Sequence, residues 1–318
     1  MQVVMCEDYG VPASLVVKDV ASPVAGPGEV KVRLKARGVS FSDVLRIAGT
    51  YHVKTTPPFI PGGEAAGEIV AVGTGVAGLA VGDPVLCGGG FAEETVQPTA
   101  NVIKLPAGVS FEAAAAFRSN YTTALYALQR ARLQPGETLL VHGAAGGVGL
   151  ATVDVGKLLG ARVVATARSP ERLAVCRKLG ADHVIDYSRG FREDVLALTG
   201  GRGADVIFDP VGGDVFDESM RCVAPFGRLL IVGFTSGRPA VAKTNHLLVK
   251  DAEVIGFTIG ALAKIDPARA RRNLETLVGW LGAGRIQPYH SHALPLAKAA
   301  EALQLVIDRK VIGKALLV

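Results

Sequence analysis

The chain lacks the sequence features that mark several large classes of protein. It has no C-x-x-C pair, which argues against a zinc cluster or a disulfide framework and favours reduced thiols in a cytoplasmic protein. No stretch approaches 18 uninterrupted apolar residues, so we expect no membrane-spanning helix. The first ten residues carry two acids and no apolar core, so no signal peptide is predicted. The four cysteines are Cys6, Cys87, Cys176 and Cys222.

Aromatic residues and clustered charge are also scarce. Aromatics make up 6% of the 318 residues, and the formal charge of +5 is spread along the chain. A spread charge is poor evidence for nucleic-acid or membrane binding, so we expect neither partner. Apolar residues make up 49% of the chain, which is enough for two domains with real cores.

A glycine-rich corner at residues 139–151 organises the rest of the chain. The apolar run from Thr138 to Val141 predicts a buried strand, and residues 148–159 have apolar positions at helical spacing. Between them Ala144-x-Gly146-x-x-Gly149 stands in place of the G-x-G-x-x-G pattern of dinucleotide-binding folds. Small residues there allow a tight turn, and the new helix offers free N–H groups to phosphates.

Strands and helices then alternate along the chain. Five further strands are predicted, and helical patterns separate them. This alternation predicts a parallel sheet with helices on both faces, and the glycine corner lies where such folds bind a dinucleotide. The predicted strands are Arg162–Thr166, Val184–Ile185, Asp205–Phe208, Arg228–Val232 and Val254–Phe257.

The end of the second strand indicates which dinucleotide is bound. NAD sites place an acid about 20 residues past the glycines, on the ribose 2′-hydroxyl. This chain has Arg168 and Ser169 there instead. A guanidinium and a hydroxyl suit a 2′-phosphate, so the sequence predicts NADPH as the cofactor.

The flanking segments predict a second, mostly antiparallel β-domain. Residues 30–36 alternate apolar and charged side chains, and glycine- and proline-rich turns separate further short strands. Asp266 and Pro267 predict the start of a new helix. We expect residues 1–123 to begin the β-domain, residues 124–265 to form the nucleotide domain, and residues 266–318 to return to the β-domain. The ligand cleft is expected between the two domains.

Several ordered motifs resemble one family. The chain is similar to the medium-chain dehydrogenase/reductase superfamily, and within it to the zinc-free quinone oxidoreductase (zeta-crystallin-like) branch. The resemblance implies a GroES-like β-domain joined to a Rossmann domain. The motifs are Gly38 to Asp43, Pro61 to Gly67, Gly82 to Val85 and the glycine corner.

The resemblance also implies that no zinc is bound. Zinc-dependent members carry Cys at the position of Ser40 and His at that of Gly63, and they have four clustered cysteines where this chain has Cys87 alone nearby. A catalytic zinc needs three protein ligands, which Ser40, Gly63 and Glu64 do not supply.

Cofactor contacts follow from the resemblance position by position. The glycine corner would hold the pyrophosphate, and Arg168, Ser169 and Tyr187 would meet the 2′-phosphate. Tyr187 could instead cap the third strand. Segments after later strands would contact the rest of the cofactor, and Lys314 would approach it from the other domain. The predicted cofactor residues are Ala145, Gly146, Gly147, Val148, Arg168, Ser169, Tyr187, Gly213, Val232, Gly233, Phe234, Thr235, Phe257, Thr258, Ile259 and Lys314.

The substrate cleft departs from the branch. Ser40 replaces a common Asn and Leu45 a common Tyr, and Tyr51 is our candidate proton donor. Asp43 has a structural alternative, in which its carboxylate accepts hydrogen bonds from backbone N–H groups. The predicted cleft residues are Ser40, Asp43, Leu45, Asn120, Tyr121 and Thr123.

The predicted reaction is hydride transfer from NADPH to a quinone or another electron-poor acceptor. Enals, enones and enoyl thioesters stay open as acceptors, and so does a non-catalytic NADPH-binding role. No tyrosine has a lysine four residues on, which argues against a short-chain reductase, and Leu158 after Gly156-Lys157 excludes a P-loop. The resemblance implies a homodimer joined near the Val254 strand.

Overall fold

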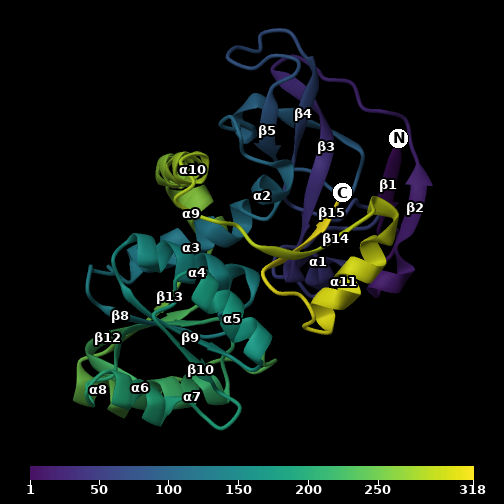
Figure 1. Ribbon diagram of the computed structural model, residues 1–318. Coiled ribbons are helices and arrows are strands. Elements are labelled where there is room, and N and C mark those ends of the chain that lie inside the picture. The colour runs from purple at the N-terminus through teal and green to yellow at the C-terminus, as the bar shows by residue number, and fades with distance from the viewer. The chain divides into compact units, whose positions relative to one another are not determined.

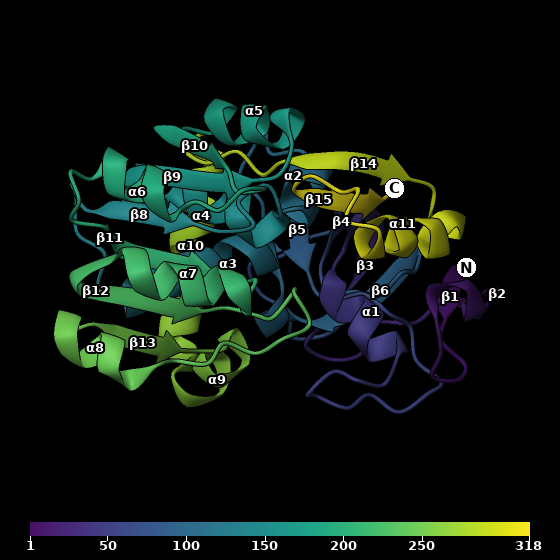
Figure 2. The same cartoon turned by 90° about the horizontal axis from the view of Figure 1, so that it is seen from below.

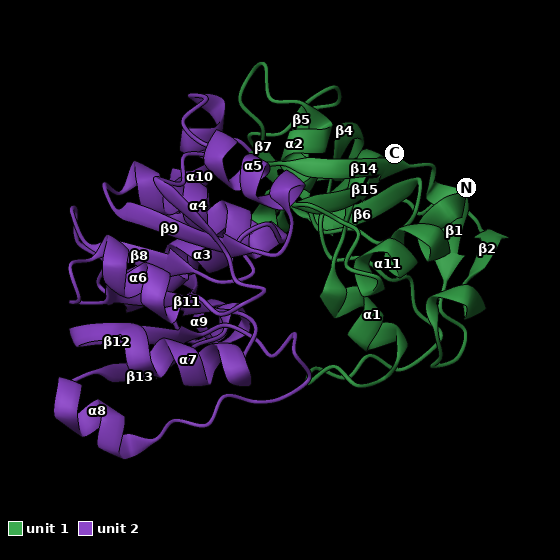
Figure 3. Cartoon of the chain, turned by 60° about the horizontal axis from the view of Figure 1, so that its bottom comes forward, with its two compact units in different colours: residues 1–118, 288–318 green, residues 119–287 purple.

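The computed structural model describes all 318 residues and divides the chain into two compact units (Figure 3). Unit 1 comprises residues 1–118 and 288–318, and unit 2 comprises residues 119–287. No helix is both long and apolar enough to cross a membrane.

Unit 1 is built on a seven-stranded, mostly antiparallel sheet (Figure 1). Its strands run in the order β14-β15-β3-β4-β5-β7, and β6 pairs with β3. The one parallel pair is β14 with β15, and both strands belong to the chain's final return. A separate pair, β1 and β2, completes the strands of the unit. The bounds are β1 Gln2–Met5, β2 Val16–Asp19, β3 Glu29–Val39, β4 Ala65–Val72, β5 Pro84–Cys87, β6 Glu94–Pro98, β7 Ile103–Lys104, β14 His290–Leu294 and β15 Lys314–Leu317.

The alternating pattern of residues 30–36 forms β3 as predicted. Val30, Val32 and Leu34 are buried in one apolar cluster, while Lys31 and Arg33 between them point away from it. A second core joins α1 (Phe41–Ile47) and α11 (Ala299–Ile307) to β15. Three short 3₁₀ turns, η1 Pro12–Ser14, η2 Thr99–Asn101 and η3 Leu296–Lys298, and the helix α2 Phe111–Ala115 complete the unit.

Unit 2 is a six-stranded parallel sheet in the order β10-β9-β8-β11-β12-β13. The chain adds β9 and β10 on one side of β8 and then β11, β12 and β13 on the other side. Right-handed crossovers therefore place α4 and α5 on one face of the sheet and α6 and α7 on the other, as Figures 1 and 2 show. The strands are β8 Thr138–Val141, β9 Arg162–Ala167, β10 His183–Asp186, β11 Ala204–Asp209, β12 Val223–Ile231 and β13 Glu253–Gly256. The helices are α3 Arg118–Arg130, α4 Gly147–Leu158, α5 Pro170–Lys178, α6 Arg192–Leu198, α7 Asp214–Cys222, α8 Thr244–Lys250, α9 Ile259–Ile265 and α10 Pro267–Gly282.

The predicted α/β class with an antiparallel unit and a parallel sheet is confirmed. The compact units, however, divide at Arg118 and Pro288 and not at residues 123 and 266. The helix α10 is capped by Asp266 as predicted, but it belongs to unit 2. Its Asn273 exchanges hydrogen bonds of 2.9 and 3.0 Å with Gln129 of α3. A side-chain contact over such a sequence separation has no local signature.

Candidate functional site

The glycine corner joins β8 to α4 at the carboxyl end of the parallel sheet. Gly143 has a left-handed backbone (φ 55°), which turns the chain away from the strand. Its carbonyl accepts the Gly146 N–H at 2.9 Å, and Gly146 is the N-cap of α4 with no side chain to cover the helix end. The first N–H groups of α4 therefore remain available to an anion, and the helix dipole favours one there.

The glycines of the corner have two different structural roles. A Cβ on Gly149 would lie 2.3 Å from the Gly143 carbonyl oxygen, so α4 can rest on the turn only because Gly149 has no side chain. A Cβ on Gly147 would meet the side chain of Asn120 at 2.6 Å. At Gly146 the nearest atom would be 3.3 Å away, so absence of a side chain there leaves room above the corner. Ala145 is buried beneath it, and Val148 is half-buried.

Two loops after the neighbouring strands lie against each other at the same end of the sheet. The Thr235 N–H donates to the Pro210 carbonyl at 3.0 Å, which ties the loop after β12 to the loop after β11. Gly213 has φ of 56° and precedes α7. Val232 and Gly233 are half-buried, and Phe234 is exposed. Five predicted cofactor residues therefore belong to one loop pair.

Asp209 fixes the first of these loops. Its Oδ1 accepts the N–H groups of Val211 at 2.7 Å and Gly212 at 3.0 Å. Its Oδ2 is buried without a hydrogen-bond partner. Burial raises the pKa of Asp209, opposed by the two backbone hydrogen bonds. No local pattern in the sequence singled this residue out.

Arg168 and Tyr187 come together from the ends of β9 and β10. The guanidinium carbon of Arg168 lies 4.8 Å from the centre of the Tyr187 ring, in cation–π contact. Ser169 caps α5, because its Oγ accepts the Arg172 N–H at 3.3 Å. Arg168 itself is exposed. The ring holds the guanidinium in place while leaving its N–H groups able to bind phosphate oxygens.

The segment after β13 leads into α9. The Phe257 ring packs edge-on against Tyr126 with centroids 5.6 Å apart. Thr258 is the N-cap of α9 and accepts the Ala261 N–H at 3.1 Å, and Ile259 begins the helix. The side chain of Thr258 is thus engaged locally, while contacts of this segment with a cofactor stay a prediction.

His142, the residue after β8, is fully buried and hydrogen-bonded at both ring nitrogens. Ser219 Oγ donates to the Val215 carbonyl at 2.7 Å, so it accepts from Nε2 of His142 at 2.9 Å. Nδ1 then accepts from Thr166 Oγ1 at 3.0 Å. Burial lowers the pKa of His142 from 6.5 to about 3. A neutral histidine therefore anchors the end of the strand that carries the glycine corner.

In unit 1, Lys314 is the centre of a buried polar cluster. Its ammonium forms an ion pair with Glu64 and donates a 2.7 Å hydrogen bond to Ser40 Oγ. Both charged side chains are 4% exposed. Gly38 makes room for the pair, because a Cβ there would come within 2.8 Å of the Glu64 carboxylate. Three segments far apart in the sequence thus meet at one point.

Asp43 stabilises the same corner from the first turn of α1. Its Oδ2 accepts the Ser40 N–H at 2.8 Å, which is the structural role considered for it. Burial raises the pKa of Asp43 to about 6, while its hydrogen bond with Ser40 and the charges of Lys314 and Arg46 act in the opposite direction.

Tyr51 lies beyond the other end of α1. Its N–H donates to the Leu45 carbonyl at 3.1 Å, and its ring stands 5.1 Å from the Arg46 guanidinium carbon. The Nε of Arg46 is buried without a partner. The tyrosine ring also contacts His52 at 4.2 Å. Leu45 contributes its backbone carbonyl to this turn.

The three predicted cleft residues of α3 have different surroundings. Tyr121 is buried, and its hydroxyl donates to Asp154 Oδ2 at 2.6 Å. Thr123 donates to the Ser119 carbonyl at 2.7 Å. Asn120 lies against Gly147 of the glycine corner. Among the three, Asn120 is therefore the one that the structure brings to the predicted cofactor residues of unit 2.

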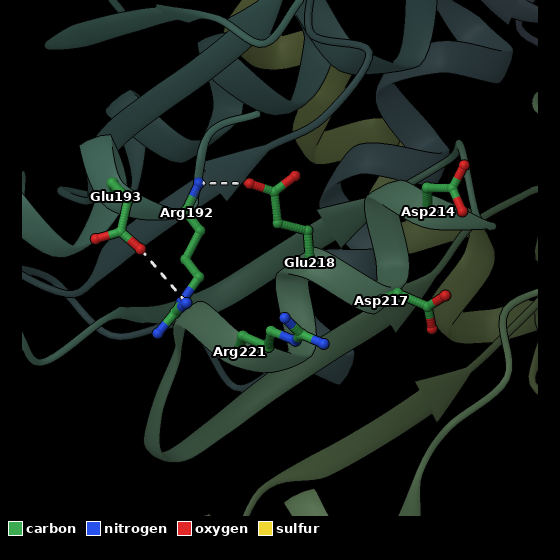
Figure 4. Close-up of a pocket in the computed structure, with 6 residues that line it drawn as sticks. All are labelled: Arg192, Glu193, Asp214, Asp217, Glu218 and Arg221. Atoms are coloured by element: carbon green, nitrogen blue, oxygen red, sulfur yellow. Dashed lines mark hydrogen bonds and ion pairs between the residues drawn. The ribbon is translucent and has the colours of Figure 1, made fainter. Parts of the chain in front are cut away.

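A cavity lined by residues of α6 and α7 has a different character. Its volume is about 380 Å³ (Figure 4). Glu218 already accepts the N–H groups of Phe191 and Arg192 there, and Arg192 pairs with Glu193 at 3.4 Å. The lining is charged throughout, so we read it as a solvated hollow on the helix surface. The lining residues are Arg192, Glu193, Asp214, Asp217, Glu218 and Arg221.

Sequence comparison matches both units to known families. Residues 26–107 match the family described as alcohol dehydrogenase GroES-like domain, and residues 147–277 match the family described as zinc-binding dehydrogenase. A quinone oxidoreductase-like protein 2 homolog of Nematostella vectensis is 41% identical over 320 residues, covering 98% of this chain and 87% of the relative. A quinone oxidoreductase of Pseudomonas aeruginosa is 35% identical over 316 residues, covering 97% of each chain.

Solved structures agree with the sequence comparison. The Escherichia coli quinone oxidoreductase complexed with NADPH superposes with a TM-score of 0.89 at 27% identity, covering 100% of both chains. Fold similarity therefore extends over both units of the chain.

Proposed function

Because this chain belongs to the medium-chain dehydrogenase/reductase superfamily, in its quinone oxidoreductase branch, we propose that it is an NADPH-dependent reductase of quinones or other electron-poor acceptors. The observation that carries the proposal is the uncapped glycine corner with Arg168 at the end of the next strand. The relatives support an oxidoreductase that uses a nicotinamide cofactor.

The residues of unit 2 fit the cofactor. In the proposal the N-terminus of α4 holds the pyrophosphate, since Gly146 and Gly147 leave its N–H groups uncovered. Arg168, Ser169 and Tyr187 hold the 2′-phosphate. Bound NADPH supplies the hydride. Direct cofactor contacts by Lys314 and by residues 257–259 stay predictions.

Replacing Arg168 tests the choice of cofactor. Arg168→Ala is expected to raise the Kd for NADPH by about 10- to 100-fold, because charge-assisted hydrogen bonds to the 2′-phosphate are lost. The Kd for NADH should stay within about twofold of the wild type, because NADH has no such phosphate. Titration followed by nicotinamide fluorescence measures both constants.

The control for this experiment is Arg177→Ala, which replaces an exposed arginine in the last turn of α5, the helix that follows Arg168. It removes the same charge at the far end of the helix and should leave both constants unchanged. An equal loss of NADPH and NADH affinity in Arg168→Ala would exclude the 2′-phosphate role.

Zinc does not fit the site that the family description implies. The carboxylate of Glu64 is paired with the Lys314 ammonium, and Ser40 accepts a hydrogen bond from the same ammonium. No group of three or more His, Cys, Asp or Glu side chains is arranged to hold a metal ion. We therefore propose a zinc-independent reaction.

The protein's task is then to bind, orient and exclude water. We propose that the acceptor binds at the N-terminus of α1, where Ser40 is partly exposed. A second candidate reaction is reduction of an α,β-unsaturated carbonyl, for which a proton must reach the product. Tyr51, held beside the Arg46 guanidinium, favours this possibility.

An acceptor panel tests the function. Menadione, 2-cyclohexen-1-one and crotonyl-coenzyme A are each incubated with the protein and NADPH, and the loss of NADPH absorbance is followed with NADH as the control. Turnover of menadione supports the quinone reductase, and turnover of the enone or thioester alone supports the second candidate. NADPH binding without any turnover would leave a non-catalytic binding protein.

We also propose a homodimer. The strand β13 is an edge of the parallel sheet and has one neighbour, β12. Pairing of this edge with the same edge of a second copy would satisfy its backbone groups in both chains.

A further inference from the structure

The hydroxyl of Ser40 is held in an unusual orientation. An ammonium group has only donors, so in the 2.7 Å contact Lys314 donates and Ser40 Oγ accepts. A serine hydroxyl has a single hydrogen, and this contact therefore directs it away from Lys314. No protein atom of the chain accepts that hydrogen in the structure, although the Ser40 N–H is taken up by Asp43.

Burial of the ion pair makes this orientation persistent. Lys314 and Glu64 are each 4% exposed, whereas Ser40 is partly exposed at the N-cap of α1. Separating a buried ammonium from its carboxylate costs several kcal/mol of free energy. The Lys314 ammonium therefore stays in contact with Ser40 Oγ. The Ser40 hydroxyl is thus a hydrogen-bond donor whose orientation is fixed by the buried Lys314 ammonium, at a residue that is partly exposed to solvent.

We propose that Ser40 donates a hydrogen bond to the oxygen of the acceptor on which negative charge develops, and that Lys314 positions and polarises it. This inference rests on the proposed function. The pair would then perform the electrostatic task that a Lewis acid performs in metal-dependent enzymes. Ser40 is the catalytic residue in this proposal, and Lys314 is a positioning residue.

The electron balance of the step is simple. A hydride adds to the acceptor carbon, the π-electron pair moves onto the acceptor oxygen, and the nicotinamide becomes oxidised. Ser40 keeps its proton and only donates a hydrogen bond to the new oxyanion. The proton that completes the reduction comes from solvent water.

Substitution of the hydroxyl provides the first test. Ser40→Ala is expected to lower kcat for the acceptor reduced in the panel by about 100- to 1,000-fold, the range for one lost oxyanion donor. Its KM for NADPH should change less than twofold. Ser40→Thr, which keeps the hydroxyl, should recover most of the rate. Ser42→Ala, which removes a neighbouring hydroxyl from the first turn of the same helix, is the matched control and should behave as the wild type.

A binding measurement removes the dependence on turnover. In the presence of NADPH, 4-nitrophenolate serves as a stable oxyanion, and its binding is followed by the shift of its visible absorption. We expect Ser40→Ala to bind it at least about tenfold more weakly than the wild type, while Ser40→Thr and Ser42→Ala bind it normally. Absence of phenolate binding to the wild type counts against the proposal.

Testing the role of Lys314 requires a variant that does not leave the buried Glu64 carboxylate unpaired. Lys314→Met combined with Glu64→Gln removes the ion pair as a unit. If this double variant keeps its thermal unfolding temperature, it should lose as much phenolate affinity as Ser40→Ala, and adding Ser40→Ala should cost little more. Additive losses would show that Lys314 does not act through Ser40.

The outcomes separate the two proposals. Normal rates and normal phenolate binding in Ser40→Ala overturn the role of Ser40 while the reductase stands. Weakened phenolate binding in a protein that reduces no acceptor supports the donor role and overturns the proposed function. Equal losses in Ser42→Ala and Ser40→Ala would assign the effect to α1 as a whole and overturn the inference.

Discussion

Gly149→Ala is expected to destabilise unit 2 by about 3 kcal/mol, at the upper end of the range for overpacked positions. The added Cβ would lie 2.3 Å from the Gly143 carbonyl oxygen and 2.7 Å from the Ala144 Cα. Both are backbone atoms of the turn, so no rotamer change can relieve the contact. The helix α4 would have to move off the strand that it covers. Urea unfolding measures the loss, followed by the fluorescence of Trp280, the single tryptophan, which lies in α10 of the same unit.

Gly146→Ala is the matched control, because the two glycines stand in one motif but meet different surroundings. Its Cβ would stay 3.3 Å from the nearest atom, and its backbone (φ −77°, ψ 169°) suits any residue. We expect a stability loss below about 1 kcal/mol, as for other substitutions at an N-cap. The Kd for NADPH should nevertheless rise at least about tenfold, because the methyl group occupies the approach to the helix N-terminus. A Gly149→Ala protein as stable as the wild type would show that α4 does not depend on this contact.

His142 is expected to make unit 2 sensitive to acid. Its pKa is about 3 in the folded protein and 6.5 without burial, so the unfolded chain binds more protons between these values. The stability that depends on neutral His142 is therefore complete above pH 6.5 and is lost as the pH falls toward 3. The full difference corresponds to about 5 kcal/mol, or about 1.4 kcal/mol per pH unit within this window.

The variant His142→Gln isolates this contribution. Buried carboxyls such as Asp43, with a pKa raised to about 6, act with the opposite sign, because their contribution to stability is lost as the pH rises. These groups are common to both proteins and cancel in the difference. We expect His142→Gln to be less stable than the wild type at pH 8 and the gap to shrink below pH 6.5, as measured by urea unfolding with Trp280 fluorescence. The partly exposed His246 of the same unit provides the control, since His246→Gln should give a curve parallel to the wild type. A gap that stays constant down to pH 4 would contradict the assignment.

Local sequence patterns predict much of the fold. The alternation in β3, the apolar runs of the parallel strands and the small residues of the glycine corner each report on near neighbours, and each predicted strand of the parallel sheet is present. The alanine-rich segment at residues 111–130 forms two helices, α2 and α3. Here an alanine-rich sequence gave no sign of the break, since alanine favours helix equally on both sides.

The site was only partly accessible from sequence. The motif around residues 61–67 drew attention to Glu64, yet its pairing with Lys314 joins positions at opposite ends of the chain. Arg46 and Asp209 carried no motif and emerged from their unpartnered buried atoms. Tyr121 was predicted to line the cleft, but its hydroxyl donates a hydrogen bond to Asp154.

By itself, the sequence determined the fold class, the place of the glycine corner and the absence of an acid at Arg168, because each depends on residue types within a few positions of one another. The tertiary structure alone decided that Lys314 stands behind Ser40, that Tyr187 supports Arg168 and that α10 packs on α3. These contacts depend on strand order and helix packing, which bring distant side chains within hydrogen-bond reach, and charge or polarity at one position does not specify which distant partner it will meet.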